Sequence, residues 1–349
     1  MDIKTKTAVV ILNWNGRHFL EKFLGKVIDS ISSSEVYGAK LVVADNASSD
    51  GSVEWMKANC PQAELILLDK NYGFADGYNK SLEQIDAEYY VLLNSDIEVT
   101  GNWLPPLVNY MDNNPEVAAC APKLRAFNDP GFFEYAGAGG GFIDRYGYIF
   151  CRGRILDSIE EDRGQYDNGI HVFWATGAAL MIRSELFHRA GGFDGSFFAH
   201  MEEIDLCWRL QLMGYKISNV PESVVYHVGG GALPNNSPRK LYLNYRNNLM
   251  MMAKNLSKNR WLIIFIRLFM DGASAIVYLA SGKFSYFNAV IMAHRAFFGR
   301  IALCRKKRKA FRPLIVKEAD TGIYEGSIVW KYFRSGKKIT FTCLKMKNL

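Results

Sequence analysis

Short, continuous apolar runs alternate with amphipathic stretches through the first 100 residues of the chain. Four of these runs predict buried strands, at residues 8–12, 41–44, 65–68 and 89–93. Apolar residues at helical spacing predict helices over residues 19–31, 52–59 and 75–85. Because uninterrupted apolar strands that alternate with helices are typical of a parallel sheet covered on both faces, we expect an α/β fold here.

The predicted strands all end in polar residues, and ligands of such sheets bind beyond the carboxyl ends of the strands. Asp45 lies at one strand end, where its carboxylate can accept a hydrogen bond from a nucleotide base or a ribose hydroxyl. Asp50 follows in the same segment and is better explained as a helix cap. Asn71 and Gly73 follow the third strand and are candidates for phosphate or sugar contact, although Gly73 could equally be required by the backbone.

Asn94, Ser95 and Asp96 close the fourth predicted strand. Side chains two residues apart point the same way from a strand, so Asn94 and Asp96 can present two oxygen atoms together. Such hard ligands suit Mg²⁺ or Mn²⁺ that bridges a diphosphate. The alternative is a turn in which the three side chains only satisfy local backbone groups.

The regular alternation of apolar and amphipathic stretches is lost after the first 125 residues. Residues 126–168 are rich in glycine and aromatic residues and predict a loop or hairpin insertion that lines an acceptor site. A helix is predicted over residues 202–213, with strands at 215–218 and 224–227. His227 ends the second of these strands and is either structural or a metal ligand. Beyond residue 240 the composition turns helical.

Three acids crowd the start of the helix predicted at residue 202. Asp205 is explained by an ion pair with Arg209, four residues along the helix. Glu202 and Glu203 are less well explained by helix stability alone. A carboxylate at a helix N-terminus is expected to stay ionised, ready to take the proton from an acceptor hydroxyl.

Composition and charge narrow the functional classes. The chain has 349 residues, 49% hydrophobic and 22% charged, and a net charge of +7. Residues 300–312 include seven basic residues and no acid. An anionic membrane surface is favoured over nucleic acid as the partner of this run, because few aromatic residues interleave with the basic ones. A solvated basic face is the alternative. Six scattered cysteines and an N-terminus without a secretory apolar region predict a cytoplasmic protein, with a peripheral position on the inner face of the cytoplasmic membrane as the alternative to a freely soluble one.

Residues 261–280 form a long apolar stretch that contains Arg267 and Asp271. A charge near the middle of a bilayer costs about 3 kcal/mol on insertion scales. The stretch therefore predicts a helix packed on the domain or lying on a membrane surface, and not a transmembrane span.

Four segments together resemble the inverting glycosyltransferases of family 2, in particular their bacterial rhamnosyltransferase-like branch. They are residues 10–16, 43–52, 71–79 and 202–209, and the resemblance spans residues 7–248. It implies a GT-A type α/β fold: a mostly parallel, Rossmann-like sheet flanked by helices, with a C-terminal helical extension. The GT-A domain would cover residues 1–240, with a nucleotide-sugar half at 1–100 and an acceptor half at 101–240. The basic, helical extension would cover residues 241–349.

The resemblance also implies roles for individual residues. Glu203 would be the catalytic base, supported by Glu202. Asp96 would be the main ligand of Mg²⁺ or Mn²⁺, with His227 as a further ligand. The residues expected to bind the nucleotide sugar are Asn13, Asn15, Asp45, Asn71, Gly73, Asn79, Asn94 and Gly177.

The implied reaction moves a sugar from dTDP-rhamnose or a UDP-sugar to a glycan or lipid-linked oligosaccharide acceptor, in one inverting displacement during cell-surface polysaccharide synthesis. One alternative is a catalytically inactive sugar- or nucleotide-binding protein on the same fold. A dinucleotide-dependent oxidoreductase fits poorly, because residues 13–16 do not supply the glycine-rich turn that such enzymes place after the first strand.

Overall fold

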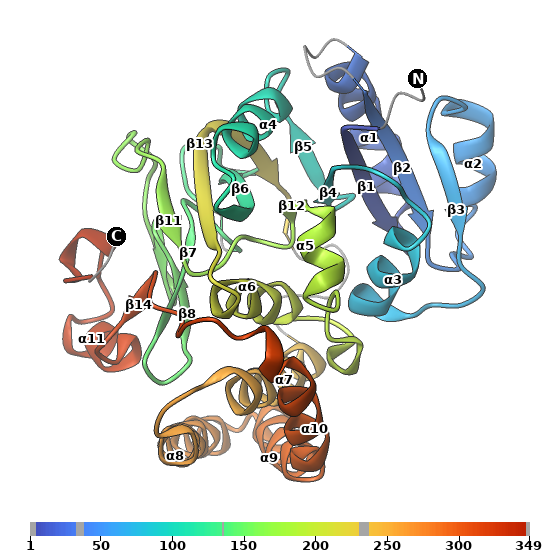
Figure 1. The fold of residues 1–349 in the computed structure, drawn as a ribbon. Helices are drawn as coiled ribbons and strands as arrows, with labels where there is room; N and C mark the ends of the chain where they lie inside the picture. Colours follow the sequence, from blue (N-terminus) through green and yellow to red (C-terminus); the bar gives the residue numbers. More distant parts are fainter. Residues whose placement is uncertain (1–4, 33–37, 135, 230–236, 347–349) are drawn as a thin grey trace.

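The computed structural model describes residues 5–32, 38–134, 136–229 and 237–346 (Figure 1). Residues 1–4, part of the N-terminal segment considered above, lie outside this range. The predicted strands are β1 (Thr7–Asn13), β2 (Ala39–Asp45), β3 (Glu64–Leu67) and β4 (Tyr89–Leu93). The predicted helices are α1 (Arg17–Ser32), α2 (Ser52–Asn59) and α3 (Gly73–Leu82). The alternation read from the apolar pattern is therefore confirmed, with boundaries that shift by up to three residues.

The main sheet has nine strands within the described residues, in the order β11-β13-β6-β12-β4-β1-β2-β3, with β5 paired to β13. Its remaining members are β5 (Ile97–Val99), β6 (Val117–Ala126), β11 (Ile170–Val172), β12 (Ala179–Arg183) and β13 (Lys216–His227). The strands β4, β1, β2 and β3 run parallel to one another, and β12 is antiparallel to both of its neighbours, β4 and β6. The mostly parallel sheet that was predicted is confirmed.

Helices cover both faces of this sheet, as Figure 1 shows. Alternate residues of each strand enter opposite cores: Val9 and Ile11 pack with α1 and α4 (Leu104–Asn113), whereas Ala8 and Val10 face α3 and α6 (Glu202–Leu212). Because both faces are buried, the parallel strands are apolar at every position and not at every second one.

A smaller sheet replaces the loop or hairpin expected over residues 126–168. It has the order β10-β9-β8-β7-β14. Its strands are β7 (Gly141–Asp144), β8 (Ile149–Cys151), β9 (Arg154–Ile155), β10 (Ser158–Ile159) and β14 (Ile323–Tyr324). The meander of hairpins agrees with the glycine-rich composition, but β14 comes from the C-terminal extension and pairs parallel to β7. The extension is therefore mostly helical and also adds a strand to the smaller sheet.

The two strands expected near residues 215–218 and 224–227 are a single strand, β13. Its register with β6 shifts between Val220 and Val224. Pro221 lies within this irregularity, and a proline cannot donate to the ladder, which explains why the sequence suggested a break. The continuous strand carries His227 to the same edge of the sheet as β5.

The C-terminal extension wraps around α6. Its helices are α7 (Pro238–Asn255), α8 (Arg260–Ala280), α9 (Phe284–Phe298), α10 (Ile301–Phe311) and α11 (Ile328–Arg334). Helix α7 packs on α6 and also on α8, α9 and α10, and these helices gather at one end of the molecule (Figure 1). Among the described residues, α8 is the one helix whose length and hydropathy would suffice to cross a membrane.

Candidate active site

The carboxyl ends of β1 and β2 bring Asn13 and Asp45 together. They are paired in the register of the two strands, and the Asn13 Nδ2 donates to Asp45 Oδ2 at 3.0 Å. The other carboxylate oxygen of Asp45 accepts from the amide of Ser48 at 2.8 Å. The Asn13 Oδ1 is shielded from solvent and has no hydrogen-bond partner. A buried acceptor without a partner costs free energy, so a ligand that donates to this oxygen would be favoured.

Asn94, Ser95 and Asp96 form a turn and do not continue β4, which ends at Leu93. The expectation that Asn94 and Asp96 point the same way because they alternate along a strand is therefore wrong. The amide of Asn94 donates to the carbonyl of Ala178 at 2.9 Å, which fixes the start of this turn. The turn leads into β5 and leaves Asp96 buried at the sheet edge.

Asp96 lies beside His227, because β5 pairs with the end of β13. The His227 Nε2 is 3.3 Å from Asp96 Oδ1, and its Nδ1 is 3.2 Å from Glu134 Oε1. Burial disfavours the imidazolium, but the hydrogen bonds and charges of Asp96 and Glu134 outweigh it and raise the pKa of His227 to about 10. The two carboxylates thus create a buried site that favours positive charge.

The described residues contain no group of three or more His, Cys, Asp or Glu side chains arranged to hold a metal ion on their own. A divalent cation with fewer protein ligands nevertheless fits Asp96 and His227. Mg²⁺ is commonly held by one or two carboxylates together with substrate phosphates, and neighbouring ligands of an octahedral ion lie about 3 Å apart. The 3.3 Å between Asp96 Oδ1 and His227 Nε2 is close to that spacing.

Glu202 and Glu203 begin α6, as predicted, but their expected ionisation is wrong. One carboxyl oxygen of each is shielded from solvent and has no hydrogen-bond partner. Burial raises the pKa of Glu203 to about 7, although backbone hydrogen bonds, one of them at Gly177, favour the carboxylate. Burial and the charges of Glu203 and Asp205 raise the pKa of Glu202 well above its ordinary value. Desolvation thus outweighs the helix N-terminus that was expected to keep both acids charged.

Gly177 joins the two acids of α6 to the Asp96 turn. A side chain at Gly177 would come within 3.5 Å of Glu203. Its neighbour Ala178 accepts the amide of Asn94, two residues before Asp96. On the other side, the Thr176 hydroxyl donates to the carbonyl of Ala136 at 2.8 Å, next to the segment that carries Glu134. One short segment therefore contacts Glu203 of α6, the turn and the segment that carries Glu134.

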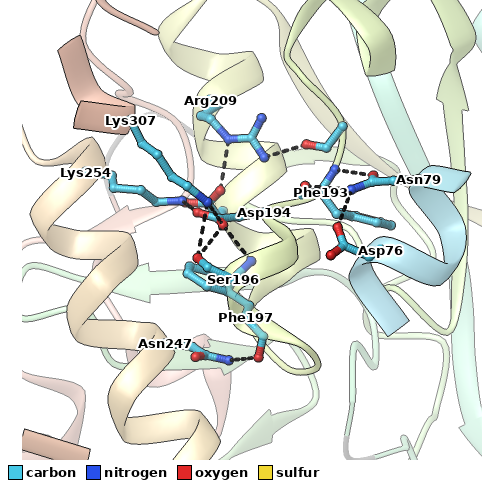
Figure 2. Close-up of polar contacts among 12 residues, drawn as sticks. Asp76, Asn79, Phe193, Asp194, Ser196, Phe197, Arg209, Asn247, Lys254 and Lys307 are labelled. Carbon is cyan, nitrogen blue, oxygen red and sulfur yellow. Dashed lines mark hydrogen bonds and ion pairs between the residues drawn. The ribbon is translucent and has the colours of Figure 1, made fainter. Parts of the chain in front are cut away.

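The loop before α6 is strained and is held by α7. Phe198, His200 and Met201 have φ values of 68°, 71° and 75°, in the left-handed region that non-glycine residues rarely adopt. The Asn247 amide of α7 donates to the carbonyls of Phe197, Ala199 and His200. Figure 2 shows the first of these bonds. Strain of this kind persists only where the surrounding structure imposes it, and it occurs frequently at functional sites.

A buried ionic network fastens the segment before this loop to the C-terminal helices (Figure 2). Asp194 pairs with Lys254 of α7 and Lys307 of α10. Lys254 is also 2.9 Å from Asp205, which forms the predicted ion pair with Arg209 at 2.9 Å. Although the carboxyl of Asp194 is buried, the two lysines lower its pKa. The extension thus supports α6 through charges as well as through apolar packing.

Three residues expected to bind the nucleotide sugar make structural contacts within the protein. Asn71 accepts the amide of Gly73 at 2.7 Å. Gly73 has a φ of 75°, and a Cβ there would lie 2.6 Å from the ring of Phe198, so its glycine is required by the backbone. Asn79 holds both the amide and the carbonyl of Phe193, each at 2.9 Å (Figure 2). The role of these residues in donor binding stays a prediction.

Asn15 also links two loops, because its Oδ1 accepts the amide of Ser49 at 2.8 Å. Asp50 accepts the amides that begin α1 and α2, at Arg17 and Ser52, in agreement with its predicted capping role. A cavity of about 350 Å³ lies elsewhere, between the segment around Asp194 and helices α7 and α10. It does not include the residues of the Asp96 and Glu203 site.

The sequence did not indicate Glu134, Asp194, Asn247 or Lys254. Glu134 lies in the irregular glycine-rich segment, where no periodicity marks it. Lys254 and Asn247 act on residues about 50 positions away, and such contacts leave no local pattern. Asp194 follows Gly191, Gly192 and Phe193, and that turn-like composition was the one signal that pointed to this segment.

Comparison with known proteins gives a consistent result. A family model described as Glycosyl transferase family 2 matches residues 8–189, more than half of the chain. The chain is 25% identical over 237 residues to N-acetylglucosaminyl-diphospho-decaprenol L-rhamnosyltransferase of Mycobacterium tuberculosis, which covers 63% of this chain and 75% of the relative. It is 24% identical over 221 residues to Rhamnosyltransferase WbbL of Escherichia coli K12, covering 60% of this chain and 80% of the relative.

The fold is also similar to a solved structure of GalNAc-T7 with UDP, GalNAc and Mn²⁺. The TM-score is 0.58 at 16% sequence identity, and the alignment covers 87% of this chain and 57% of that one. This likeness confirms the GT-A type of fold that the sequence predicted, with a central sheet, flanking helices and a helical C-terminal region.

Proposed function

The chain belongs to glycosyl transferase family 2, as its four motifs predicted, and we propose that it moves a sugar from a nucleoside diphosphate sugar to a glycan or lipid-linked oligosaccharide acceptor. The rhamnosyltransferase names of two relatives support dTDP-rhamnose as a donor, with UDP-sugars as the other candidates. Cell-surface polysaccharide synthesis is the process that such a transfer would serve. Six free cysteines agree with the proposed cytoplasmic location.

Glu203 carries this proposal as the catalytic base. Its carboxyl lies at the start of α6 with one oxygen shielded and unpartnered, and this oxygen would accept the proton of a bound hydroxyl. A base works best when its pKa lies near the operating pH, and burial has moved the pKa of Glu203 to about 7. Glu202, whose pKa is raised by burial and by the neighbouring Glu203, would support acceptor binding.

The reaction we propose is a single displacement. Glu203 takes the proton of the acceptor hydroxyl, the hydroxyl oxygen bonds to the anomeric carbon, and the bond from that carbon to the diphosphate breaks on the opposite side. The nucleoside diphosphate leaves with the bonding electrons, and the anomeric centre inverts, by the same logic as in one-step inverting glycosidases.

Asp96 and His227 would hold a divalent cation, Mg²⁺ or Mn²⁺, against the diphosphate of the donor. When bound, the ion would supply positive charge that stabilises the leaving diphosphate. The Mn²⁺ in the GalNAc-T7 structure supports this assignment. Asn13 and Asp45 would contact the base or ribose at the ends of β1 and β2. Asn15, Asn94 and Gly177 complete the proposed donor site.

The test is release of nucleoside diphosphate from a panel of nucleotide sugars, with and without Mn²⁺. We expect Glu203→Gln to bind the donor normally and to lose transfer by about 100- to 10,000-fold, the usual contribution of a general base. Glu185→Gln, an exposed glutamate in the first turn of α5 (Ser184–Arg189), is the matched control and should keep full activity.

Two outcomes would overturn the proposal. Nucleotide binding without turnover of any donor would favour the inactive sugar- or nucleotide-binding alternative. Normal turnover by Glu203→Gln would move the base elsewhere, with Glu202 as the next candidate.

A further inference from the structure

Exposed apolar side chains concentrate on two neighbouring helices of the C-terminal extension. Within the described residues, α8 and α9 carry eleven of the eighteen large apolar side chains that are exposed to solvent. Leu262, Phe265, Phe269 and Ile276 form one stripe along α8, and Phe265 and Phe269 are 68% and 75% exposed. Soluble proteins rarely leave a contiguous apolar face of this kind without a partner.

The opposite face of α8 is buried, and there Arg267 and Asp271 form an ion pair between the apolar Ile264 and Ala275. The Arg267 Nε donates to Asp271 Oδ1 at 2.7 Å, and its Nη1 donates to Asn248 Oδ1 at 2.8 Å. The Tyr148 hydroxyl donates to Asp271 at 3.1 Å. These bonds fix α8 to α7 and to the smaller sheet, so lipid cannot surround the helix on all sides. The helix therefore presents its apolar face without spanning a bilayer.

The charge around this apolar face is almost entirely positive. Residues 260–311 contain ten Lys and Arg residues and a single acid, Asp271, which is buried and paired. The Trp261 ring lies 5.0 Å from the guanidinium of Arg260 and 5.7 Å from that of Arg305. Tryptophan flanked by cations is typical of the interface between lipid headgroups and acyl chains. A second copy of the chain would bring two positive rims together, so the charge favours an anionic partner.

We propose that the exposed face of α8 and α9 docks on an anionic lipid bilayer, with the apolar stripe in the headgroup region and the cations of α10 on lipid phosphates. The sequence left open whether residues 261–280 pack on the domain or lie on a membrane surface, and the structure shows one buried face and one exposed apolar face of this helix. This inference does not rest on the proposed function. Membrane docking would nevertheless bear on the proposed active site, because Lys254 and Lys307 join the C-terminal helices to the segment that precedes α6.

The experiment is flotation of the full chain with vesicles of phosphatidylcholine alone and of equal parts phosphatidylcholine and phosphatidylglycerol. We expect binding to the anionic vesicles and much weaker binding to the neutral ones. The double variant Phe265→Ser, Phe269→Ser should bind the anionic vesicles about tenfold less or weaker, because two aromatic anchors are lost. Trp330→Ser with Phe333→Ser removes two exposed aromatics of α11 and is the matched control, which should bind normally.

A second variant separates charge from apolar contact. Arg305→Gln, Lys306→Gln and Lys309→Gln together should abolish the preference for anionic vesicles. Failure of the wild type to float with anionic vesicles would overturn the proposal, as would equal binding by the Phe265 and Phe269 variant. A dimer that this variant converts to a monomer would instead assign the face to self-association. Since flotation needs no sugar donor, none of these outcomes depends on catalysis.

Discussion

Asp194→Asn should destabilise the protein and reduce transfer, although residue 194 lies outside the reacting groups. The asparagine has the same shape and can still accept the amide of Ser196, which Asp194 Oδ1 accepts at 3.1 Å. What is lost is the negative charge that pairs with Lys254 and Lys307 (Figure 2). The substitution therefore tests the ionic link between the extension and the segment before α6.

The size of the expected loss in stability follows from how far the two lysines are exposed to solvent. The side chain of Lys254 is 5% exposed, so its bond to Asp194 counts in full, about 1.5–3 kcal/mol for a hydrogen bond between charged groups. Lys307 is 35% exposed, and screening by solvent reduces its contribution to below about 1 kcal/mol. Lys254 keeps Asp205 at 2.9 Å, so no buried charge is left alone. We expect a loss of about 3 kcal/mol in the free energy of unfolding.

Thermal unfolding measures this effect, with Asp129→Asn, an exposed aspartate, as the control. The Asp194 variant should unfold about 5 °C lower than the wild type, and the control should match the wild type. Because the pKa of Asp194 is lowered in the folded protein, its contribution is complete above the ordinary aspartate pKa and is lost as the pH falls below it. A variant within 0.5 kcal/mol of the control at neutral pH, a difference about as large as surface substitutions give, would refute the reasoning.

Two further predictions concern the site itself. Because burial raises the pKa of Glu203 to about 7, the base is ionised above that pH, so kcat/KM should fall about tenfold per pH unit below it and level off above it; an inflection at the ordinary glutamate pKa in the pH profile would contradict this. Gly73→Ala should cost about 2 kcal/mol or more in thermal or denaturant unfolding, since its φ is 75° and the new Cβ would lie 2.6 Å from the Phe198 ring. Gly25→Ala, within α1 and with no atom within 4 Å of its Cβ, should instead gain about 0.5–1 kcal/mol; equal effects of the two substitutions would show that the Phe198 contact is not tight.

Local patterns in the sequence predicted those parts of the molecule that depend on neighbours in the chain. The strands and helices of the first 100 residues follow from periodicity, and the pair of Asp205 with Arg209 follows from helical spacing. The polar ends of the predicted strands pointed to the edge of the sheet where the structure brings Asn13 and Asp45 together.

Other features depend on contacts between distant segments. The start of the turn at Asn94–Asp96 is fixed by a hydrogen bond to Ala178, whereas the sequence left a strand end and a local turn both open. The raised pKa of Glu203 was not predicted, because it results from burial in the complete fold. The sequence shows only that the residue lies at the start of a helix. Glu134 was missed for the same reason, because what singles it out is its contact with His227, more than 90 residues away in the sequence.

The hold of α7 on the strained loop also sets the order in which the site is assembled. Synthesis proceeds from the N-terminus, so the segment that matches the family model is complete before α7 leaves the ribosome. Residues 198–201 have left-handed backbone at three positions, and Asn247 binds two of their carbonyls, those of Ala199 and His200. The edge of the sheet that carries Asn13 and Asp45 can therefore form early, whereas the loop that places Glu202 and Glu203 is completed late. A nascent chain would thus have this sheet edge in place before the two acids of α6.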